Sequence, residues 1–500
     1  MEGILGLERS ALDRARVSRD ARFDGRFFIA VASTGIYCRP VCPVPSPKNV
    51  NIRYYVTAAA AAEAGYRPCL RCRPEAAPGT PAWLGTSAVV RRALGLIQEG
   101  ALDDASVDAL AARLGIGPRH LHRLFIQHVG AAPITVAQTR RLQFAKRLLD
   151  ETDLPMTEIA LAAGFGSLRR FNDTFQRAYR RAPRELRRRR GRGLAAAGGG
   201  EVVLRLAFRP PYDWPQVRDF LATRAVPGVE RVDARGYART VAAAGGGHTF
   251  VCVRALEDEH ALELRVRGAE PAALFQLSST ARRAFDLAAD PARIARAFRS
   301  DPLLGPLVRL RPGLRIPGAW DPFECAVRAV LGQQVSVAAG RTLAARLVSR
   351  VGRRIAADGD GLTHLFPAPE ALAVADLDGL GLTSARVGAL RALAQATTEG
   401  ALDLTAPVEE VTAALVALPG LGDWTAQYVA LRALGEPDAF PAADLVLRRA
   451  AAAGGAPLTA RALASRAEVW RPWRGYAVLH LWRAASDRLV RAEGPRVRRP

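Results

Sequence analysis

GIYCRPVCP (35–43) and RPCLRC (67–72) each contain two of the chain's six cysteines. Two close pairs of thiolates form the ligand set that a tetrahedral zinc ion prefers. We therefore expect a zinc site in the N-terminal part of the chain, with the ligands Cys38, Cys42, Cys69 and Cys72. Such a site is either a closed structural clasp or a centre in which one sulfur reacts.

The basic composition favours a polyanionic partner. The 500 residues are 49% hydrophobic and have a net charge of +23, and nucleic acid is the simplest partner for such an excess. A general composition bias is the alternative, because nearly all basic residues are arginines and the only lysines are Lys48 and Lys146. The length predicts roughly three domains, each with its own core.

The N-terminal stretch MEGILGLERSALDRAR lacks the pattern of a signal peptide. No window of about 18 uncharged apolar residues occurs, so no transmembrane helix and no membrane partner are expected. We expect a cytoplasmic protein. Because disulfides are rare in that reducing compartment, the clustered cysteines are expected to bind metal or to react.

Two related stretches, 106–133 and 155–183, predict a double helix-turn-helix. Each has an apolar-periodic helix, a turn with glycine and a basic second helix, and the helical stretch 134–151 joins them. The second helices, about 118–127 and 168–177, have the form of recognition helices for a major groove. Candidate DNA contacts are Arg119, His122, Arg123, Arg169, Arg170 and Asn172. For each of these residues alone, a solvated basic face is the alternative.

Alternation and turn residues outline the other elements. The cysteine-bearing part predicts a strand within 23–33 and a helix at 57–66. Linkers rich in proline, glycine or arginine are expected at 77–85 and 187–200. Further strands are predicted within 201–214, 249–256 and 260–268, with a helix at 214–224. From about residue 275 onward the pattern is helical, with no comparable strand.

The stretches STGIYCRPVCP (33–43) and GYRPCLRCRP (65–74) resemble the N-terminal domain of the Ada-type methyltransferases. The resemblance implies that four cysteines bind zinc and that Cys38 also accepts a methyl group from a DNA methylphosphotriester. The two helix-turn-helix units resemble an AraC-type DNA-binding domain, which follows the zinc domain in Ada-type regulators. Methylation would lower the negative charge of the site, so that DNA is repelled less and transcription is activated. No PCHR stretch occurs, so no second methyl acceptor is expected.

The stretch LPGLGDWTAQYVAL (418–431) places a Pro-Gly-Leu-Gly turn between two helical patterns. Its glycines, Gly420 and Gly422, allow backbone N–H groups to approach a DNA phosphate at the start of the next helix. This pattern predicts a helix-hairpin-helix, which alone indicates only DNA binding without sequence preference.

Asp444 follows the hairpin in the stretch AFPAADLVLRRA (439–450). A lone Asp before a helix is most often an N-cap. Hairpin and Asp together resemble the helix-hairpin-helix base-excision glycosylases, and the stretches 321–347 and 470–482 extend the resemblance to AlkA-type 3-methyladenine DNA glycosylases. This resemblance covers about residues 201–490 and implies that Asp444 is catalytic.

The absence of any lysine after Lys146 excludes a Schiff-base mechanism and leaves a monofunctional, hydrolytic glycosylase. Its carboxylate would stabilise the cationic sugar or orient water. The aromatic residues at the family's pocket positions are Trp424, Tyr428 and Trp482, which suit a cationic alkylated base. Ordinary core packing is the alternative for them. Gln334 stands where the family often has an apolar wedge, and the lone cysteines Cys252 and Cys325 are expected to be inert core residues.

These patterns and the resemblances together imply a multidomain α+β protein. We expect a small zinc-binding α/β domain, an all-α double helix-turn-helix domain, an α+β sheet domain and an all-α helix-hairpin-helix glycosylase domain. The predicted boundaries are 1–80, 85–190, 200–275 and 276–495.

The resulting hypothesis is a monomeric protein that responds to DNA alkylation. It would transfer methyl groups from phosphotriesters to Cys38, activate transcription with RNA polymerase as a partner, and excise 3-methyladenine-type bases through Asp444. Its partners would be alkylated and operator double-stranded DNA. The alternative is a transcription regulator with a structural zinc site and a degenerate glycosylase domain. A DNA-packaging protein would not explain the cysteine spacing.

Overall fold

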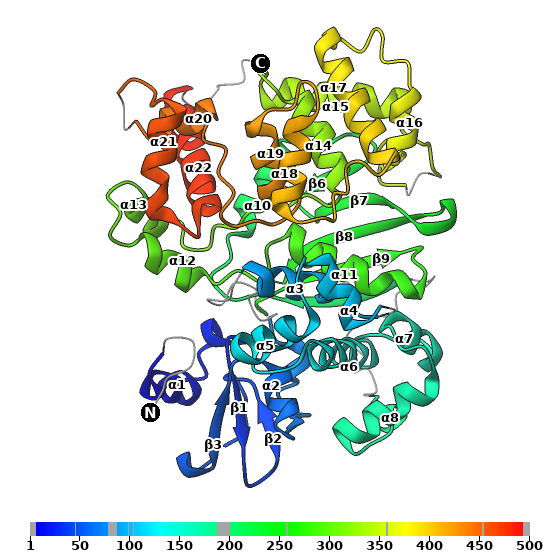
Figure 1. The fold of residues 1–500 in the computed structure, drawn as a ribbon, viewed down its shortest axis with the longest axis vertical. Coiled ribbons are helices and arrows are strands. Elements are labelled where there is room, and N and C mark those ends of the chain that lie inside the picture. The colour runs from blue at the N-terminus through cyan, green and yellow to red at the C-terminus, as the bar shows by residue number, and fades with distance from the viewer. Residues whose placement is uncertain are drawn as a thin grey trace. The chain divides into compact units, whose positions relative to one another are not determined.

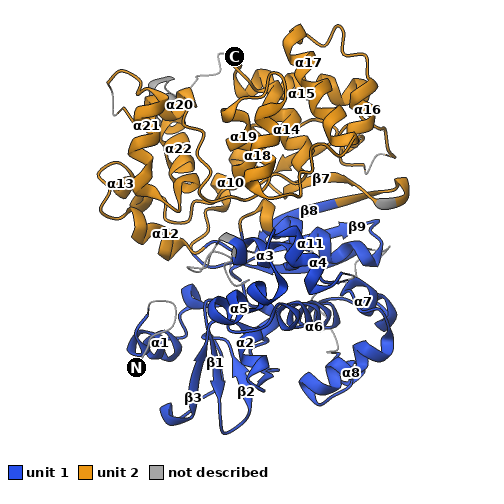
Figure 2. Ribbon diagram, in the orientation of Figure 1, with its two compact units in different colours: residues 1–210, 251–282, 287–289 blue, residues 211–250, 283–286, 290–500 orange. Residues whose placement is uncertain are grey.

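The structure is a computed structural model that describes residues 7–45, 47–78, 88–98, 100–103, 105–187, 201–256, 259–356, 359–452 and 455–493. It divides into two compact units, each described separately below (Figure 2). Unit 1 comprises residues 1–210, 251–282 and 287–289, and unit 2 comprises 211–250, 283–286 and 290–500. The linkers predicted at 77–85 and 187–200 lie outside the described residues, apart from 77, 78 and 187.

The cysteine-bearing part of unit 1 is a small sheet with helices beside it (Figure 1). Its elements are α1 (Arg9–Val17), η1 (Ala21–Phe23), β1 (Phe28–Val31), β2 (Ile36–Cys38), η2 (Asn49–Asn51), β3 (Ile52–Tyr55), α2 (Ala58–Glu63), β4 (Arg67–Pro68) and η3 (Pro74–Ala76). The strand order is β3-β1-β2-β4; β1 is antiparallel to both neighbours, and β2 is parallel to β4. The predicted strand at 23–33 and helix at 57–66 are thus confirmed as β1 and α2.

The next part of unit 1 is all-helical, and the double helix-turn-helix prediction is confirmed. Its helices are α3 (Ala88–Gln98), α4 (Val107–Arg113), α5 (Pro118–Val129), α6 (Pro133–Glu151), α7 (Met156–Ala162), α8 (Leu168–Tyr179) and α9 (Pro183–Leu186). The Ser106 and Ser167 hydroxyls accept backbone N–H groups and cap α4 and α8, as serine does at helix starts. Gly115 and Gly164 have φ of 67° and 77° in the two turns, a conformation that favours glycine.

Five further strands form a second sheet. Unit 1 contributes β5 (Glu201–Ala207), the end of β8 (His248–Leu256) and β9 (Ala261–Arg267), followed by η5 (Pro271–Ala273) and most of α11 (Leu274–Ala284). Unit 2 begins with α10 (Trp214–Ala222), β6 (Glu230–Asp233), β7 (Gly236–Ala242) and η4 (Ala244–Gly246). The strand order is β5-β9-β8-β7-β6, and the division between the units falls inside β8.

The sequence predicted β5, β8, β9 and α10 but not β6 and β7. The reason is that inward positions of these two strands hold charged residues instead of apolar ones. Glu230 and Arg239 are 8% and 3% exposed, and Arg239 donates to Glu324 at 2.6 Å. Buried ion pairs remove the hydrophobic alternation on which strand prediction depends.

The rest of unit 2 is helical, as predicted. Its helices are α12 (Pro291–Phe298), α13 (Leu304–Leu310), α14 (Pro322–Leu331), α15 (Val337–Val351), α16 (Pro369–Val374), α17 (Ser384–Thr398), α18 (Val408–Ala417), α19 (Asp423–Arg432), α20 (Leu445–Ala450), α21 (Ala460–Ala467), η6 (Glu468–Trp470) and α22 (Arg474–Glu493). Helices α14, α15 and α17–α19 enclose one large apolar core. Among the described residues, no helix is long and apolar enough to span a membrane.

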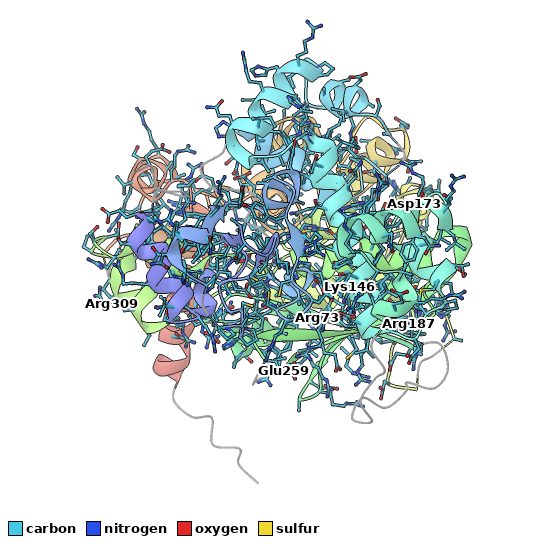
Figure 3. The ribbon with its side chains drawn as sticks, turned by 90° about the horizontal axis from the view of Figure 1, so that it is seen from below. Arg73, Lys146, Asp173, Arg187, Glu259 and Arg309 are labelled. Carbon is cyan, nitrogen blue, oxygen red and sulfur yellow. The ribbon has the colours of Figure 1, made fainter. Side chains whose placement is uncertain are left out.

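Helix α6 joins the cysteine-bearing part of unit 1 to its helical part through buried charges. Lys146 and Arg73, which belong to this group, are labelled in Figure 3. Lys146, which is 2% exposed, donates to Asp150 at 2.6 Å and lies 3.5 Å from Glu75. Arg73, next to Cys72, approaches the same Asp150 at 2.8 Å. On the other side, Glu151 accepts the Arg205 N–H of β5 at 2.9 Å. The cysteine-bearing part and the helix-turn-helix are therefore held by one ionic cluster.

Lys146→Met tests this cluster. The substitution leaves the Asp150 and Glu75 carboxylates without their ammonium partner, and breaking one side of a buried pair costs about 3–5 kcal/mol. We expect hydrogen–deuterium exchange of peptides from α6 to report a loss of that size in the free energy of opening. The matched control is Lys48→Met, because Lys48 is exposed. Equal exchange in the two variants would contradict the assignment.

Candidate active sites

The four cysteines predicted to bind metal lie together at the ends of β2 and β4. The two strands are parallel and pair Tyr37 with Pro68, so Cys38 and Cys69 come next to each other at the strand ends. The Cys69 backbone N–H donates to the Tyr37 carbonyl oxygen at 3.0 Å and fixes this alignment. Parallel pairing thus explains how residues 31 positions apart share a site.

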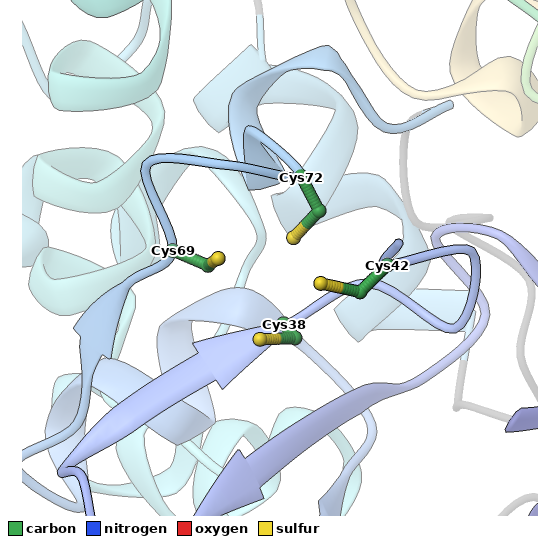
Figure 4. A group of neighbouring side chains, drawn as sticks. All are labelled: Cys38, Cys42, Cys69 and Cys72. Atoms are coloured by element: carbon green, nitrogen blue, oxygen red, sulfur yellow. The ribbon is translucent and has the colours of Figure 1, made fainter. Parts of the chain in front are cut away.

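Two turns bring the other cysteines to the same point (Figure 4). The Cys42 N–H donates to the Arg39 oxygen at 3.1 Å, and the Arg39 N–H donates to the Cys72 sulfur at 3.3 Å. The four sulfur atoms lie within 4.8 Å of one another. That cluster and its all-sulfur donor set fit one tetrahedral zinc ion.

The four cysteine residues differ in exposure. Cys69 and Cys72 are each 7% exposed, whereas Cys38 and Cys42 are half-buried.

Hydrogen bonds link the thiol groups of the cluster. Hydrogen bonding with Cys42 raises the pKa of Cys38 above its usual range, and hydrogen bonding with Cys38 lowers the pKa of Cys42 to about 7. Because neighbouring like charges disfavour each other, four thiolates require a cation among them.

The arginines that flank the cysteines have different roles. The Arg39 guanidinium bonds Asp24, with Nε 2.9 Å from Oδ1, and Nη1 donates to the Cys72 oxygen at 3.0 Å. Arg73 pairs with Asp150, and only Arg71 is exposed. Two of the three arginines thus hold the protein together, and one is available to a DNA phosphate.

The predicted recognition helices are α5 and α8, each two residues longer than expected. Every candidate contact on them is exposed: Arg119, His122, Arg123, Arg169, Arg170 and Asn172. Their apolar neighbours Phe125 and Phe171 are fully buried. The basic residues therefore occupy the outward face of each helix, as groove contact requires.

The hairpin lies between α18 and α19. Gly420 has φ of 79°, and a Cβ there would lie 2.9 Å from the Ala389 Cβ, so only glycine fits. Gly422 is the N-cap of α19 with φ of −103°, and a Cβ there would meet nothing within 4 Å. Its open surroundings leave room for a phosphate at the helix start.

Asp444 lies at a pocket of about 410 Å³ in unit 2. It caps α20, since Oδ1 accepts the Leu447 N–H at 2.9 Å. The same carboxylate accepts the Trp424 and Trp482 indole N–H groups at 3.0 and 3.3 Å. The N-cap interpretation is correct but incomplete, because three donors hold the carboxylate in the pocket wall.

The three predicted aromatic residues form one wall of this pocket. Trp424 stacks on Tyr428 with ring centroids 5.3 Å apart, and Tyr428 lies 6.2 Å from Trp482 at 47°. All three are partly exposed and line the pocket, and Tyr428 also packs against the apolar core. A planar base fits against such faces.

Two arginines that line the pocket are not among the predicted site residues. Arg432 donates to the Tyr428 hydroxyl at 2.6 Å and lies 4.6 Å from the Phe220 ring. Arg224 covers the same ring at 3.7 Å, and burial lowers its pKa to about 10. Arg432 follows Tyr428 by four residues, a helical spacing that predicts a shared face. Arg224 follows Phe220 by the same spacing, but Phe220 is not among the predicted site residues.

Gln334 lies in the turn between α14 and α15 beside this pocket, with an exposed side chain and φ of 53°. Cys325 lines the pocket but is buried, and burial raises the pKa of its thiol to about 11. Cys252 is half-buried in β8.

Four sequence families match successive parts of the chain. Residues 11–75 match the metal binding domain of Ada, and 110–189 match a helix-turn-helix domain. Residues 203–321 match the AlkA N-terminal domain, and 327–474 match the HhH-GPD superfamily of base excision DNA repair proteins.

Known relatives cover one or both halves. A probable bifunctional transcriptional activator/DNA repair enzyme AlkA of Mycobacterium tuberculosis is 44% identical over 473 residues, 94% of this chain and 95% of that protein. DNA-3-methyladenine glycosylase 2 of Escherichia coli is 41% identical over 55% of this chain and 95% of its own length. A 3-methyladenine DNA glycosylase structure from Archaeoglobus fulgidus shares the fold, with a TM-score of 0.50 and 23% identity over 56% of this chain and 98% of its own.

The cysteine cluster lies in the first matched part, the exposed basic helices lie in the second, and the glycine hairpin and Asp444 both lie in the last. The predicted resemblance and multidomain α+β fold class are confirmed. The chain belongs to the family of bifunctional transcriptional activator/DNA repair enzymes in which an Ada-type regulator is joined to an AlkA-type DNA glycosylase.

Proposed function

We propose that Cys38 takes methyl groups from methylphosphotriesters in double-stranded DNA. The half-buried position of Cys38, beside two more deeply buried cysteines, supports this role. Cys38 attacks the methyl carbon, an S–C bond forms, the O–C bond of the ester breaks, and the phosphodiester anion leaves. A bound zinc ion would compensate the four thiolates and keep Cys38 deprotonated. The product is a thioether, so each chain reacts once.

The cluster then has one negative charge fewer, and we propose that the chain binds operator DNA more tightly in this form. Arg119, Arg123, Arg169 and Arg170 are the proposed helix-turn-helix contacts, supported by their exposure. We further propose that the chain acts as a monomer and contacts RNA polymerase as an activator. We also propose that its four domains have the boundaries predicted from the sequence.

Mass analysis of peptides after incubation with methylphosphotriester DNA tests the acceptor. We expect one added methyl on the peptide with Cys38, and none after Cys38→Ser substitution or removal of zinc by a chelator. Cys252→Ser, which changes a cysteine outside the cluster, is expected to keep full uptake. A methyl found on Cys42 instead would reassign the acceptor, and none on either would leave a structural zinc site.

We propose that unit 2 hydrolyses the glycosidic bond of alkylated purines by a monofunctional mechanism. The observation that supports it best is the Asp444 carboxylate, held by Trp424 and Trp482 in the wall of an aromatic pocket. The C1′–N bond breaks, both electrons leave with the base, and Asp444 stabilises the cationic sugar. Water then adds to C1′ and loses a proton. No lysine follows Lys146, so an amine adduct on the sugar is not available from lysine.

Asp444→Asn tests this assignment. Asparagine can still cap α20, but it lacks the negative charge, so we expect single-turnover base release from methylated DNA to fall by about 10²–10³-fold. Asp213→Asn is the matched control, because Asp213 caps α10 in the same way and does not line the pocket. Equal release by wild type and Asp444→Asn would favour a degenerate glycosylase domain used only for DNA affinity.

We propose that Gln334 enters the duplex where the base is flipped out. Its exposure at the tip of a turn beside the pocket supports this role. Gln334→Gly removes the side chain while suiting the φ of 53°. We expect excision from duplex DNA to fall about ten-fold or more, because unstacking costs a few kcal/mol, and excision from single strands to change little. An unchanged duplex rate would remove Gln334 from the mechanism.

A further inference from the structure

We propose that Gln333, the neighbour of Gln334, is a positioning residue that ties the insertion turn (residues 332–336) to the hairpin (residues 419–422). The proposal rests on the glycosylase function proposed above. The Gln333 amide Nε2 donates to the Gly420 oxygen at 3.0 Å and lies 3.1 Å from the Thr425 hydroxyl oxygen. Gly420 belongs to the hairpin, and Thr425 belongs to the first turn of α19 behind it.

The same residue is held by its backbone. The Arg386 guanidinium, near the start of α17, donates to the Gln333 carbonyl oxygen. A single residue of the insertion turn is thus bonded to α17, to the hairpin and to α19. Each of these three partners belongs to the helical core of unit 2.

These hydrogen bonds hold a turn that contains a residue in an unfavourable backbone conformation. Gln334 has φ of 53°, a left-handed conformation that non-glycine residues adopt only when their surroundings impose it. Gly332 before it and Ser336 after it terminate α14 and cap α15. Gln333 provides the side-chain bonds from this turn to the hairpin, so we infer that it fixes the direction in which Gln334 projects.

In this arrangement, the DNA phosphate bound at the start of α19 determines where along the duplex Gln334 inserts. When the start of α19 binds a DNA phosphate, the Gln333 amide fixes how far Gln334 lies from that phosphate. Gln334 then enters the base stack of the DNA at a fixed distance from the bound phosphate. Without the amide, the hairpin still binds DNA and the pocket still holds Asp444, but insertion and binding are no longer coordinated.

Gln333→Met tests the proposal, because methionine has a similar length and no N–H donor. We expect excision from duplex DNA to fall about ten-fold, the rate equivalent of one or two lost hydrogen bonds. Excision from single-stranded DNA is expected to stay within about two-fold of wild type. Gln395→Met, at an exposed glutamine of α17, is the matched control and is expected to behave as wild type.

A double-mutant cycle separates positioning from general damage. If Gln333 acts through Gln334, adding Gln334→Gly to Gln333→Met lowers the duplex rate little further, because neighbours that act together are not additive. Additive losses, an equal loss on single strands, or an unchanged duplex rate would overturn the proposal. Activity retained by Asp444→Asn would instead contradict the glycosylase mechanism, whatever Gln333 does.

Discussion

Four sulfur atoms within 4.8 Å of one another set the electrostatic condition on which the N-terminal unit depends. They cannot all be ionised without a cation among them, and the nearby arginines do not supply it, since Arg39 and Arg73 are paired with Asp24 and Asp150. A metal ion held by the four sulfurs, which their arrangement fits, would supply this positive charge. This division of roles keeps the thiolate chemistry separate from the ion pairs that hold the fold.

In unit 2, the charged carboxylate of Asp444 is held by neutral hydrogen-bond donors. The Asp444 carboxylate is held by a backbone N–H and two indole N–H groups, which orient it without cancelling its charge as an arginine would. The nearby arginines point elsewhere: Arg432 bonds Tyr428 and Arg224 covers Phe220. Because Arg432 also lies 5.4 Å from the Tyr428 ring, cation–π binding of the charged base proposed above would fall mainly to the two tryptophans.

The sequence was most informative where a local spacing determines the structure. Cysteine pairs, turn glycines and helical periodicity predicted the cluster, both helix-turn-helix units and the hairpin. It failed where buried charges replaced apolar residues, at β6 and β7, where Glu230 and Arg239 are nearly inaccessible. It also could not show that Gln333 bonds Gly420, 87 residues away, because only the packed core brings these residues together.

Helix α6 and the end of α5 contact the cysteine-bearing part directly. Glu75 stands three residues after Cys72 and lies 3.5 Å from Lys146 of α6, the helix between the two DNA-binding units. Thr57 of the cysteine-bearing part also donates to the Val129 oxygen at the end of α5 at 3.1 Å. The cysteine-bearing part and the helix-turn-helix are therefore connected by buried side-chain contacts at α6 and at the end of α5.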